Sequence, residues 1–412
     1  LYARLRFSPR HAVRPRDILF SLMPRMMRLP DGREGAQMLD FFMPDLACSS
    51  AVLEARKPGD AYPPHPNGRR VFHLDGYAGR LSSFMRTRQD VADEAAAFAA
   101  QIASELSAAF GVEVDVARLA GLVRRAVCAE LFYGPQFRAW LRRLRVKCVV
   151  TVVHYSRINQ ILCAAAHAEG IPVVELQHGT VYSAHPAYNL PHRDARYAPD
   201  YLFAWGRHWA GQTRNYALRK VVCVGYPALE YLLGGHAPKG RDGRRRIVFI
   251  SQGTIGADLS RRAVELCGLL SGDRYAVVYK LHPNESKTWR ELYPWLVGSG
   301  VEVVSSAERS IYDLFREASA TVGVYSTAVI ESLMWNVRGY VFGDLPGGDT
   351  MAPFLREGVL DSVTSARELA RRLEADPAPA DARVDGSCFW QPHAAANVVA
   401  ALHEIVERGE LP

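Results

Sequence analysis

Hydrophobic and polar positions alternate in regular blocks through the second half of the chain. Short apolar runs rich in β-branched residues predict strands, and segments with a 3.6-residue apolar period predict helices. The expected strands are residues 247–251, 275–281, 301–304, 321–325 and 339–342, and the expected helices are 259–270, 287–297, 311–317 and 327–335. Strands alternating with short helices are typical of a doubly wound parallel sheet.

The first half follows a less regular pattern. Strands are expected at 149–153, 173–176, 201–205 and 221–224, and helices at 92–110, 116–144 and 158–169. In the first 90 residues, prolines interrupt every periodic run, so no element is assigned there. These prolines are Pro24, Pro30, Pro44, Pro58, Pro63, Pro64 and Pro66.

A segment rich in Gly, Pro and charge at 234–243 reads as a linker between two α/β domains. We therefore predict an N-terminal domain at 1–235 with helical additions and a C-terminal domain at 244–390. Residues 391–412 are expected to form a C-terminal helix. The fold class is α/β, with two Rossmann-like domains facing a cleft.

Composition places the chain among ordinary globular proteins. It has 412 residues, 49% hydrophobic and 23% charged, and lacks a run of the roughly 18–20 apolar residues that spans a bilayer. Its seven cysteines are an odd number without zinc-type spacing, which favours reduced thiols. Because neither a DxD sequence nor a dinucleotide fingerprint is present, we expect no metal and no bound cofactor.

The net charge of +7 is unevenly distributed. Residues 1–30 contain seven arginines against one acid, Asp17, and residues 122–147 contain seven bases against Glu130, interleaved with aromatic residues. Such segments suit an anionic membrane surface or an acidic acceptor, and equally suit a solvated helix face. No nucleic-acid-binding motif is present, so that partner is not expected. The expected location is the cytoplasmic side of an inner membrane.

Three polar segments follow predicted strands. They are Leu176-Gln177-His178-Gly179-Thr180, Lys280-Leu281-His282-Pro283-Asn284-Glu285 and Tyr325-Ser326-Thr327-Ala328-Val329-Ile330-Glu331. Ligands bind at the carboxyl ends of strands in open parallel sheets, so these segments are expected to share one cleft.

These motifs resemble those of bacterial glycosyltransferases of the GT-B type that build capsule and other surface polysaccharides. The layout is also similar to that of teichoic-acid CDP-glycerol glycerophosphotransferases. The resemblance rests on His178-Gly179, His282-Pro283 and Ser326-Thr327 with Glu331, and it covers about residues 148–345. It implies a nucleotide-sugar donor, and a polysaccharide or lipid-linked glycan as acceptor.

The donor side is assigned to the C-terminal domain. Ser326 and Thr327 are a helix N-cap signal, and a helix N-terminus also attracts a phosphate. Glu331 is expected one turn further along, where the resemblance implies contact with the ribose. The donor-binding set also includes His282, Pro283 and Lys280, and as weaker candidates Ser251 and Gly253 after the first strand. Plain helix capping, a salt bridge and a packed loop remain the alternatives.

His178 is the candidate catalyst. An imidazole with an ordinary pKa near 6.5 suits removal of a proton from a sugar hydroxyl. The alternatives are that His178 only holds the phosphate, or that it closes a loop. His154 and Tyr155, after the preceding strand, and Gly179 and Thr180 are expected on the acceptor side.

The predicted function is therefore transfer of a sugar from a nucleotide-sugar to a surface polysaccharide or glycolipid. A nucleotide-sugar 2-epimerase is an alternative, although it would need more carboxylates than these segments contain. A glycerophosphotransferase of cell-wall polymer synthesis is another. A non-catalytic binding subunit is the third, and the two histidines and the Ser-Thr-Glu helix argue against it.

Overall fold

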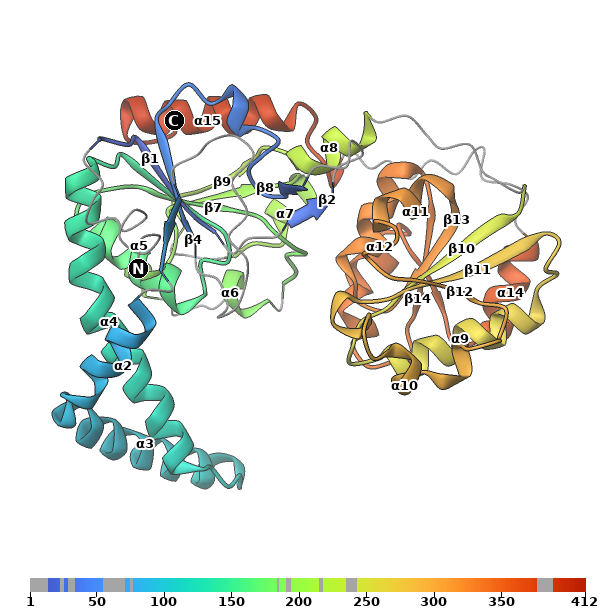
Figure 1. The fold of residues 1–412 in the computed structure, drawn as a ribbon, viewed down its shortest axis with the longest axis horizontal. Coiled ribbons are helices and arrows are strands. Elements are labelled where there is room, and N and C mark those ends of the chain that lie inside the picture. The colour runs from blue at the N-terminus through green and yellow to red at the C-terminus, as the bar shows by residue number, and fades with distance from the viewer. Residues whose placement is uncertain are drawn as a thin grey trace. The chain divides into compact units, whose positions relative to one another are not determined.

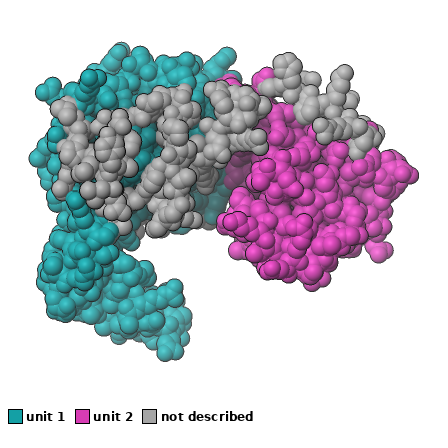
Figure 2. Space-filling model, in the orientation of Figure 1, with its two compact units in different colours: residues 1–227, 391–412 teal, residues 228–390 magenta. Residues whose placement is uncertain are grey.

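The computed structural model describes residues 14–22, 26–28, 34–54, 71–74, 77–183, 185–189, 194–214, 218–234, 243–375 and 388–412. The chain divides into two compact units (Figure 2). Unit 1 contains Leu1–Pro227 and Gln391–Pro412, and unit 2 contains Ala228–Trp390. Each unit is built on its own parallel sheet.

Unit 1 contains a seven-stranded parallel sheet in the order β5-β4-β1-β6-β7-β8-β9 (Figure 1). The strands are β1 Ile18–Leu22, β4 Ser50–Glu54, β5 Val71–His73, β6 Cys148–Thr151, β7 Val173–Leu176, β8 Tyr201–Ala204 and β9 Lys220–Cys223. The chain adds strands outward from β1 on one side and then outward from β6 on the other. The carboxyl ends of β1 and β6 therefore form the topological switch point of this sheet.

Unit 1 also contains helices, both on this sheet and in a hairpin that extends from it. They are α2 Ala78–Arg86, α3 Gln89–Phe110, α4 Val116–Leu144, α5 Arg157–His167, α6 Pro186–Asn189, α7 Arg207–Gly211 and α15 Ala394–Arg408. Short 3₁₀ turns lie at η2 Met43–Asp45 and η4 Ala195–Tyr197, and β2 Met26–Arg28 pairs with β3 Glu34–Ala36 in a separate antiparallel ribbon. The core between sheet and helices includes Phe137, Trp140 and Leu162.

Helices α3 and α4 run side by side as a hairpin that extends from the sheet of unit 1 (Figure 1). Gly111 ends α3 with a φ of 64°, a left-handed conformation that glycine adopts without strain. Asp115 begins α4 by accepting a hydrogen bond from the backbone N–H of Arg118 at 2.9 Å.

Unit 2 contains a six-stranded parallel sheet in the order β12-β11-β10-β13-β14-β15. Its strands are β10 Arg245–Ile250, β11 Tyr275–Lys280, β12 Glu302–Val304, β13 Ala318–Gly323, β14 Arg338–Phe342 and β15 Asp361–Val363. Its helices are α8 Pro227–Leu233, α9 Gly256–Leu269, α10 Trp289–Leu292, α11 Ile311–Glu317, α12 Thr327–Glu331, α13 Ala352–Arg356 and α14 Ala366–Ala375, with 3₁₀ turns η5 Pro283–Glu285, η6 Pro294–Leu296, η7 Ser332–Trp335 and η8 Gly348–Met351. The strand order is that of a Rossmann sheet, and its switch point lies after β10 and β13.

The predicted α/β class with two Rossmann-like sheets is confirmed, and several elements differ from expectation. Three sheet strands, β1, β4 and β5, lie in the first 90 residues, where none was assigned. The helix expected at 287–297 is broken, because Pro294 cannot continue it and Tyr293 adopts a φ of −130°. The strand at Arg338–Phe342 is followed by a further one, β15. The helix expected at 327–335 continues after Glu331 only as a 3₁₀ turn.

The division between the units also differs in detail from the predicted boundaries. Helix α8 is grouped with unit 2, and Arg316 donates a hydrogen bond to the Leu232 carbonyl at 2.7 Å. Helix α15 is grouped with unit 1, where the side chain of Asn397 donates to the Val224 carbonyl at 3.2 Å. Residues 235–242 of the expected linker, and most of the basic segment 1–30, lie outside the described residues.

Within the described part of the chain, no helix has the length and apolar character needed to cross a bilayer.

Candidate functional site

The switch point of unit 1 is held by a buried asparagine. Asn159 on α5 accepts a hydrogen bond from the Ser21 hydroxyl at 2.6 Å, and donates to the carbonyls of Val152 and Val153 at 2.8 and 3.1 Å. Val153 has a φ of 63°, a costly conformation for a β-branched residue. These bonds join β1 to the loop after β6 and fix where His154 and Tyr155 emerge.

A buried carboxylate lies at this edge. Glu175 on β7 is fully buried, and it accepts hydrogen bonds from the Thr151 hydroxyl at 3.0 Å, the His154 backbone N–H at 2.8 Å and the Tyr188 hydroxyl at 3.0 Å. Burial by itself would raise the pKa of Glu175. The interactions of this carboxylate with His154 and His178 outweigh the effect of burial, so the pKa of Glu175 lies below its usual range. Glu175 is therefore ionised at neutral pH.

His178 lies between this carboxylate and a phenol. Its Nδ1 is 3.6 Å from Glu175 Oε1, and its Nε2 is 3.2 Å from the Tyr155 hydroxyl. The preceding residue, Gln177, fixes the loop by donating to the Gly179 carbonyl at 2.8 Å and accepting from the Trp205 backbone N–H at 2.8 Å. The imidazole is thus oriented from both sides, as a proton-transfer group requires.

The other predicted acceptor-side residues fall into two groups. Tyr155 is 37% exposed, and Gly179 and Thr180 are partly exposed, so each can meet a ligand. His154 is 0% exposed, with Nδ1 3.2 Å from Glu175 Oε2. This burial contradicts direct contact between the His154 side chain and an acceptor, because the ring is used to hold Glu175.

At the switch point of unit 2, two loops are tied together. The Tyr325 backbone N–H donates to the side-chain oxygen of Gln252 at 3.2 Å, and the Tyr325 hydroxyl is hydrogen-bonded to Thr254. Ser326 caps α12 by accepting from the Ala328 backbone N–H at 3.3 Å. The segment after β10 and the Ser326-Thr327 segment after β13 therefore share one edge, and Gly253 is exposed there.

Ser251 faces the interior instead of this edge. Its hydroxyl donates to Glu285 at 3.0 Å and accepts from the Tyr279 hydroxyl at 2.9 Å. Glu285 also accepts from the Tyr293 hydroxyl at 2.5 Å and from the His282 backbone N–H at 2.8 Å. The prediction that the Ser251 hydroxyl contacts a phosphate is therefore corrected. This hydroxyl is part of a buried hydrogen-bond network that anchors the His282 loop.

A backbone hydrogen bond determines which ring nitrogen of His282 carries the proton. Its Nδ1 accepts a hydrogen bond from the Asn284 N–H at 3.3 Å, so in the neutral ring the proton lies on Nε2. The half-buried ring can therefore offer Nε2–H to a phosphate oxygen. Exposed Pro283 begins the 3₁₀ turn that holds it.

Lys280 is buried, and its ammonium donates to Ser306 Oγ at 2.7 Å and to the Leu281 carbonyl at 3.2 Å. Burial lowers the pKa of Lys280 to about 8. The Lys280 ammonium is therefore held inside unit 2, and its contact with a donor stays a prediction. Glu331 is 7% exposed, and one of its oxygens accepts from the Tyr312 hydroxyl at 2.9 Å.

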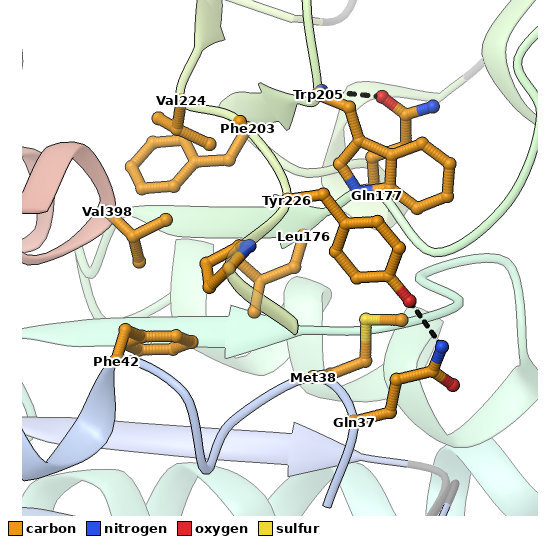
Figure 3. Close-up of a pocket in the computed structure, with 12 residues that line it drawn as sticks. Gln37, Met38, Phe42, Leu176, Gln177, Phe203, Trp205, Val224, Tyr226 and Val398 are labelled. Atoms are coloured by element: carbon orange, nitrogen blue, oxygen red, sulfur yellow. Dashed lines mark hydrogen bonds between the residues drawn. The ribbon is translucent and has the colours of Figure 1, made fainter. Parts of the chain in front are cut away.

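A small pocket of about 20 Å³ lies beside Leu176 and Gln177 in unit 1 (Figure 3). In this pocket Tyr226 stacks on Trp205, with ring centroids 4.4 Å apart and planes 9° apart, and is hydrogen-bonded to Gln37. The volume holds about one or two water molecules, so it is too small for a sugar ring.

A larger hollow of about 410 Å³ lies at the opposite, amino edge of the same sheet. Asp200 there is 3.1 Å from His167 and 2.9 Å from Arg219, so these polar groups satisfy one another.

The structure brings the predicted residues together in two sets. Unit 1 contains His178 with Tyr155, and unit 2 contains His282, Ser326, Thr327 and Glu331 at the carboxyl edge of its sheet. The meeting of the two sets in one cleft stays a prediction. In the described ranges, no three His, Cys, Asp or Glu side chains are grouped in a way that would hold a metal ion.

Sequence reasoning missed Glu175, Asn159 and Glu285. Glu175 had a usable signal, since it is an acid inside the apolar run Val173–Leu176, and an acid in a buried parallel strand needs partners. Glu285 had one as well, three residues after His282 in the spacing of a capping box.

Comparisons with known proteins bear on the fold. No protein-family model matches the sequence. No curated protein matches it either. Among solved structures, a putative UDP-N-acetylglucosamine 2-epimerase from Listeria monocytogenes superposes with a TM-score of 0.61 at 11% identity, covering 96% of this chain and 98% of that one.

Two further structures are similar in the same way. The UDP-GlcNAc 2-epimerase from Neisseria meningitidis bound to UDP-GlcNAc gives a TM-score of 0.55 at 12% identity, covering 94% and 99% of the two chains. A variant of the wall teichoic acid polymerase TagF gives 0.52 at 12% identity, covering 96% and 90%. At these identities the comparison establishes a GT-B-like two-domain fold, which is the fold that the sequence predicts.

Proposed function

We propose that this chain is an enzyme that acts on a nucleotide-linked sugar. The observation that carries the proposal is the environment of His178, which lies at a strand end between an ionised buried carboxylate and an exposed phenol. Structural packing does not require a histidine held in this way, whereas proton transfer does.

In this proposal the carboxyl edge of unit 2 holds the donor. The Nε2–H of His282 and the N-terminus of α12 at Ser326 and Thr327 would stabilise the phosphate that leaves. Glu331 would hold the ribose, and its acceptance of the Tyr312 hydroxyl would fix its rotamer. Unit 1 would supply the base and receive the acceptor.

Transfer to an acceptor hydroxyl is the reaction that the site supports best. Transfer requires the loss of one proton from the acceptor hydroxyl, and His178 is the group that would receive it. One structure with a similar fold is the wall teichoic acid polymerase TagF. Transfer of a phosphate-linked unit instead of a sugar is therefore a variant of the same proposal. A growing surface polysaccharide or a lipid-linked glycan is the proposed acceptor.

A 2-epimerase is the second candidate, and the fold comparison favours it, because the epimerases superpose better than TagF does. Epimerisation must remove the hydrogen at C2 of the sugar and return one to the opposite face. Glu175, the carboxylate beside His178, is fully buried and reaches no substrate directly.

One experiment tests the proposal and separates the two reactions. UDP-, CMP-, CDP- and GDP-linked sugars would be screened for thermal stabilisation of the protein, and the stabilising donor would then be incubated in D₂O without an acceptor. An epimerase incorporates deuterium at C2, whereas a transferase leaves the sugar unlabelled until an acceptor is added. Failure of every nucleotide-linked compound to stabilise the protein would refute the proposed function. His178→Ala should keep the donor-induced stabilisation and lose turnover.

A further inference from the structure

His178 is not the group that an incoming substrate meets first. The residue is 9% exposed, and its Nε2 lies 3.2 Å from the Tyr155 hydroxyl. Tyr155 is 37% exposed, and it follows β6 on the loop that Asn159 holds. The phenol therefore stands between the imidazole and the outside of unit 1.

The direction of the hydrogen bond between them follows from the carboxylate behind the ring. Glu175 Oε1 is 3.6 Å from Nδ1, which favours the tautomer with its proton on Nδ1. Nε2 is then an acceptor, and the Tyr155 hydroxyl donates to it. Three groups are thus aligned in the order carboxylate, imidazole, phenol.

The surroundings keep this order in place. Hydrogen bonds from the Thr151 hydroxyl, the His154 backbone N–H and the Tyr188 hydroxyl hold the Glu175 carboxylate beside His178. Besides His178, the rings of His154, His185 and Tyr188 approach Tyr155, with centroids 5.5, 5.7 and 6.4 Å away. Burial, together with the electrostatic influence of His178 and His154, lowers the pKa of His185. A neutral His185 leaves Glu175 as the charged neighbour that stabilises a protonated His178.

We propose that Tyr155 is the residue that touches the acceptor, and that it relays the acceptor's proton to His178 while Glu175 positions and stabilises the imidazole. This inference rests on the proposed function, and it changes the role of His178 from a direct base to the base behind a phenol.

The acceptor oxygen forms a bond to the sugar carbon of the donor as the bond from that carbon to the phosphate oxygen breaks, and the phosphate leaves with the electron pair. The acceptor proton passes to the Tyr155 oxygen while the phenol proton passes to His178 Nε2. The product is an imidazolium paired with Glu175, which later returns its proton to solvent.

A spectroscopic test addresses the relay without turnover. The full chain would be labelled with ¹⁵N in histidine, and the His178 signals assigned by comparison with His178→Gln. We expect Nε2 to have the shift of a hydrogen-bonded acceptor, and Tyr155→Phe to move that shift. Glu175→Gln should raise the fraction of the tautomer with its proton on Nε2. Insensitivity of the His178 signals to both substitutions would overturn the relay.

A kinetic test uses the donor identified by thermal stabilisation. Tyr155→Phe should lower kcat by about 10²-fold or more and leave the KM for the donor unchanged, because the phenol acts on the acceptor proton. Glu175→Asp should recover part of the activity that Glu175→Gln loses. Tyr182→Phe is the matched control, since the structure gives that hydroxyl no bond to His178, and it should stay within about threefold of wild type.

The kinetic test can also contradict the relay. Unchanged or faster turnover by Tyr155→Phe would make Tyr155 a cover over His178 and overturn the relay. If wild type turns over no donor, the proposed function fails, and the histidine spectra still decide whether the carboxylate, imidazole and phenol are coupled.

Discussion

The Ser21 hydroxyl donates a 2.6 Å hydrogen bond to the side-chain oxygen of Asn159, 138 residues further along the chain. This bond links β1 to the start of α5 at the switch point of unit 1. It connects the two directions in which the sheet grows, and the same Asn159 side chain bonds to Val152 and Val153, which precede His154 and Tyr155.

Asn159→Ala should weaken unit 1 and displace that loop. The substitution leaves Ser21 and the carbonyls of Val152 and Val153 without their buried partner, which should lower the free energy of unfolding by about 2–3 kcal/mol. Urea denaturation measures the loss. Gln160→Ala on the same helix is the control, and an equal loss in both variants would contradict the assignment.

Gly225→Ala should be poorly tolerated, because Gly225 has a φ of 93° and a methyl group there would overlap the Gln391 carbonyl and lie 2.6 Å from Cβ of Ala394. Strain and overlap together should lower stability by about 3 kcal/mol. Gly170→Ala is the matched control, since Gly170 has a φ of 69° but no neighbour within 4 Å of the added methyl. It should cost about 1 kcal/mol. Equal melting temperatures for the two variants would show that Gly225 is not closely packed against Gln391 and Ala394.

Lys280→Met should stabilise unit 2 at neutral pH. Because burial lowers the pKa of Lys280 to about 8, the unfolded chain binds the proton more tightly than the folded one. The resulting penalty is complete below about pH 8 and disappears as the pH rises toward about 10.4. The variant should therefore exceed wild type by up to about 3 kcal/mol at pH 7, and by less at pH 9.5. Denaturant titrations at both pH values measure this, with exposed Lys287→Met as the control variant.

Glu285→Gln should loosen the His282 loop. A glutamine can still accept from Ser251 and Tyr293, but its amide then faces the His282 N–H, donor against donor. We expect a loss of about 1–3 kcal/mol in unit 2 and weaker donor-induced stabilisation. Exposed Glu291→Gln is the control. Full donor-induced stabilisation in Glu285→Gln would mean that the His282 loop does not contribute to the donor site.

The parts of the fold that the sequence predicts best are those with strong local patterns. The helix expected at 116–144 coincides with α4, and the helix at 311–317 with α11. The strands of the first 90 residues were missed because prolines interrupt the periodic runs there. The pairing of these strands is also non-local, since Ile18 pairs with Ser50 on one side and with Cys148 on the other. Local periodicity contains no information about such pairing.

The same limit applies to the candidate site. His178 and His282 could be singled out because each follows an apolar run and has an unusual neighbour, Gly179 or Pro283. That the Tyr155 hydroxyl would meet His178 depends on two loops 23 residues apart, which only the parallel pairing of β6 with β7 brings together. Likewise, Ser251 and Lys280 follow the pattern of edge residues, and only the packing of their side chains shows that they point inward.

The grouping of α15 with unit 1 has a consequence for biosynthesis. The backbone N–H of Gln391 donates to the Trp205 carbonyl at 2.7 Å, and Val398 and Leu402 on α15 are buried. As the chain emerges from the ribosome, unit 2 has all its residues before unit 1 receives its last helix. Unit 1, whose first part precedes unit 2 in the chain, is therefore completed after it, and the apolar surface that α15 covers stays exposed until α15 has been synthesised.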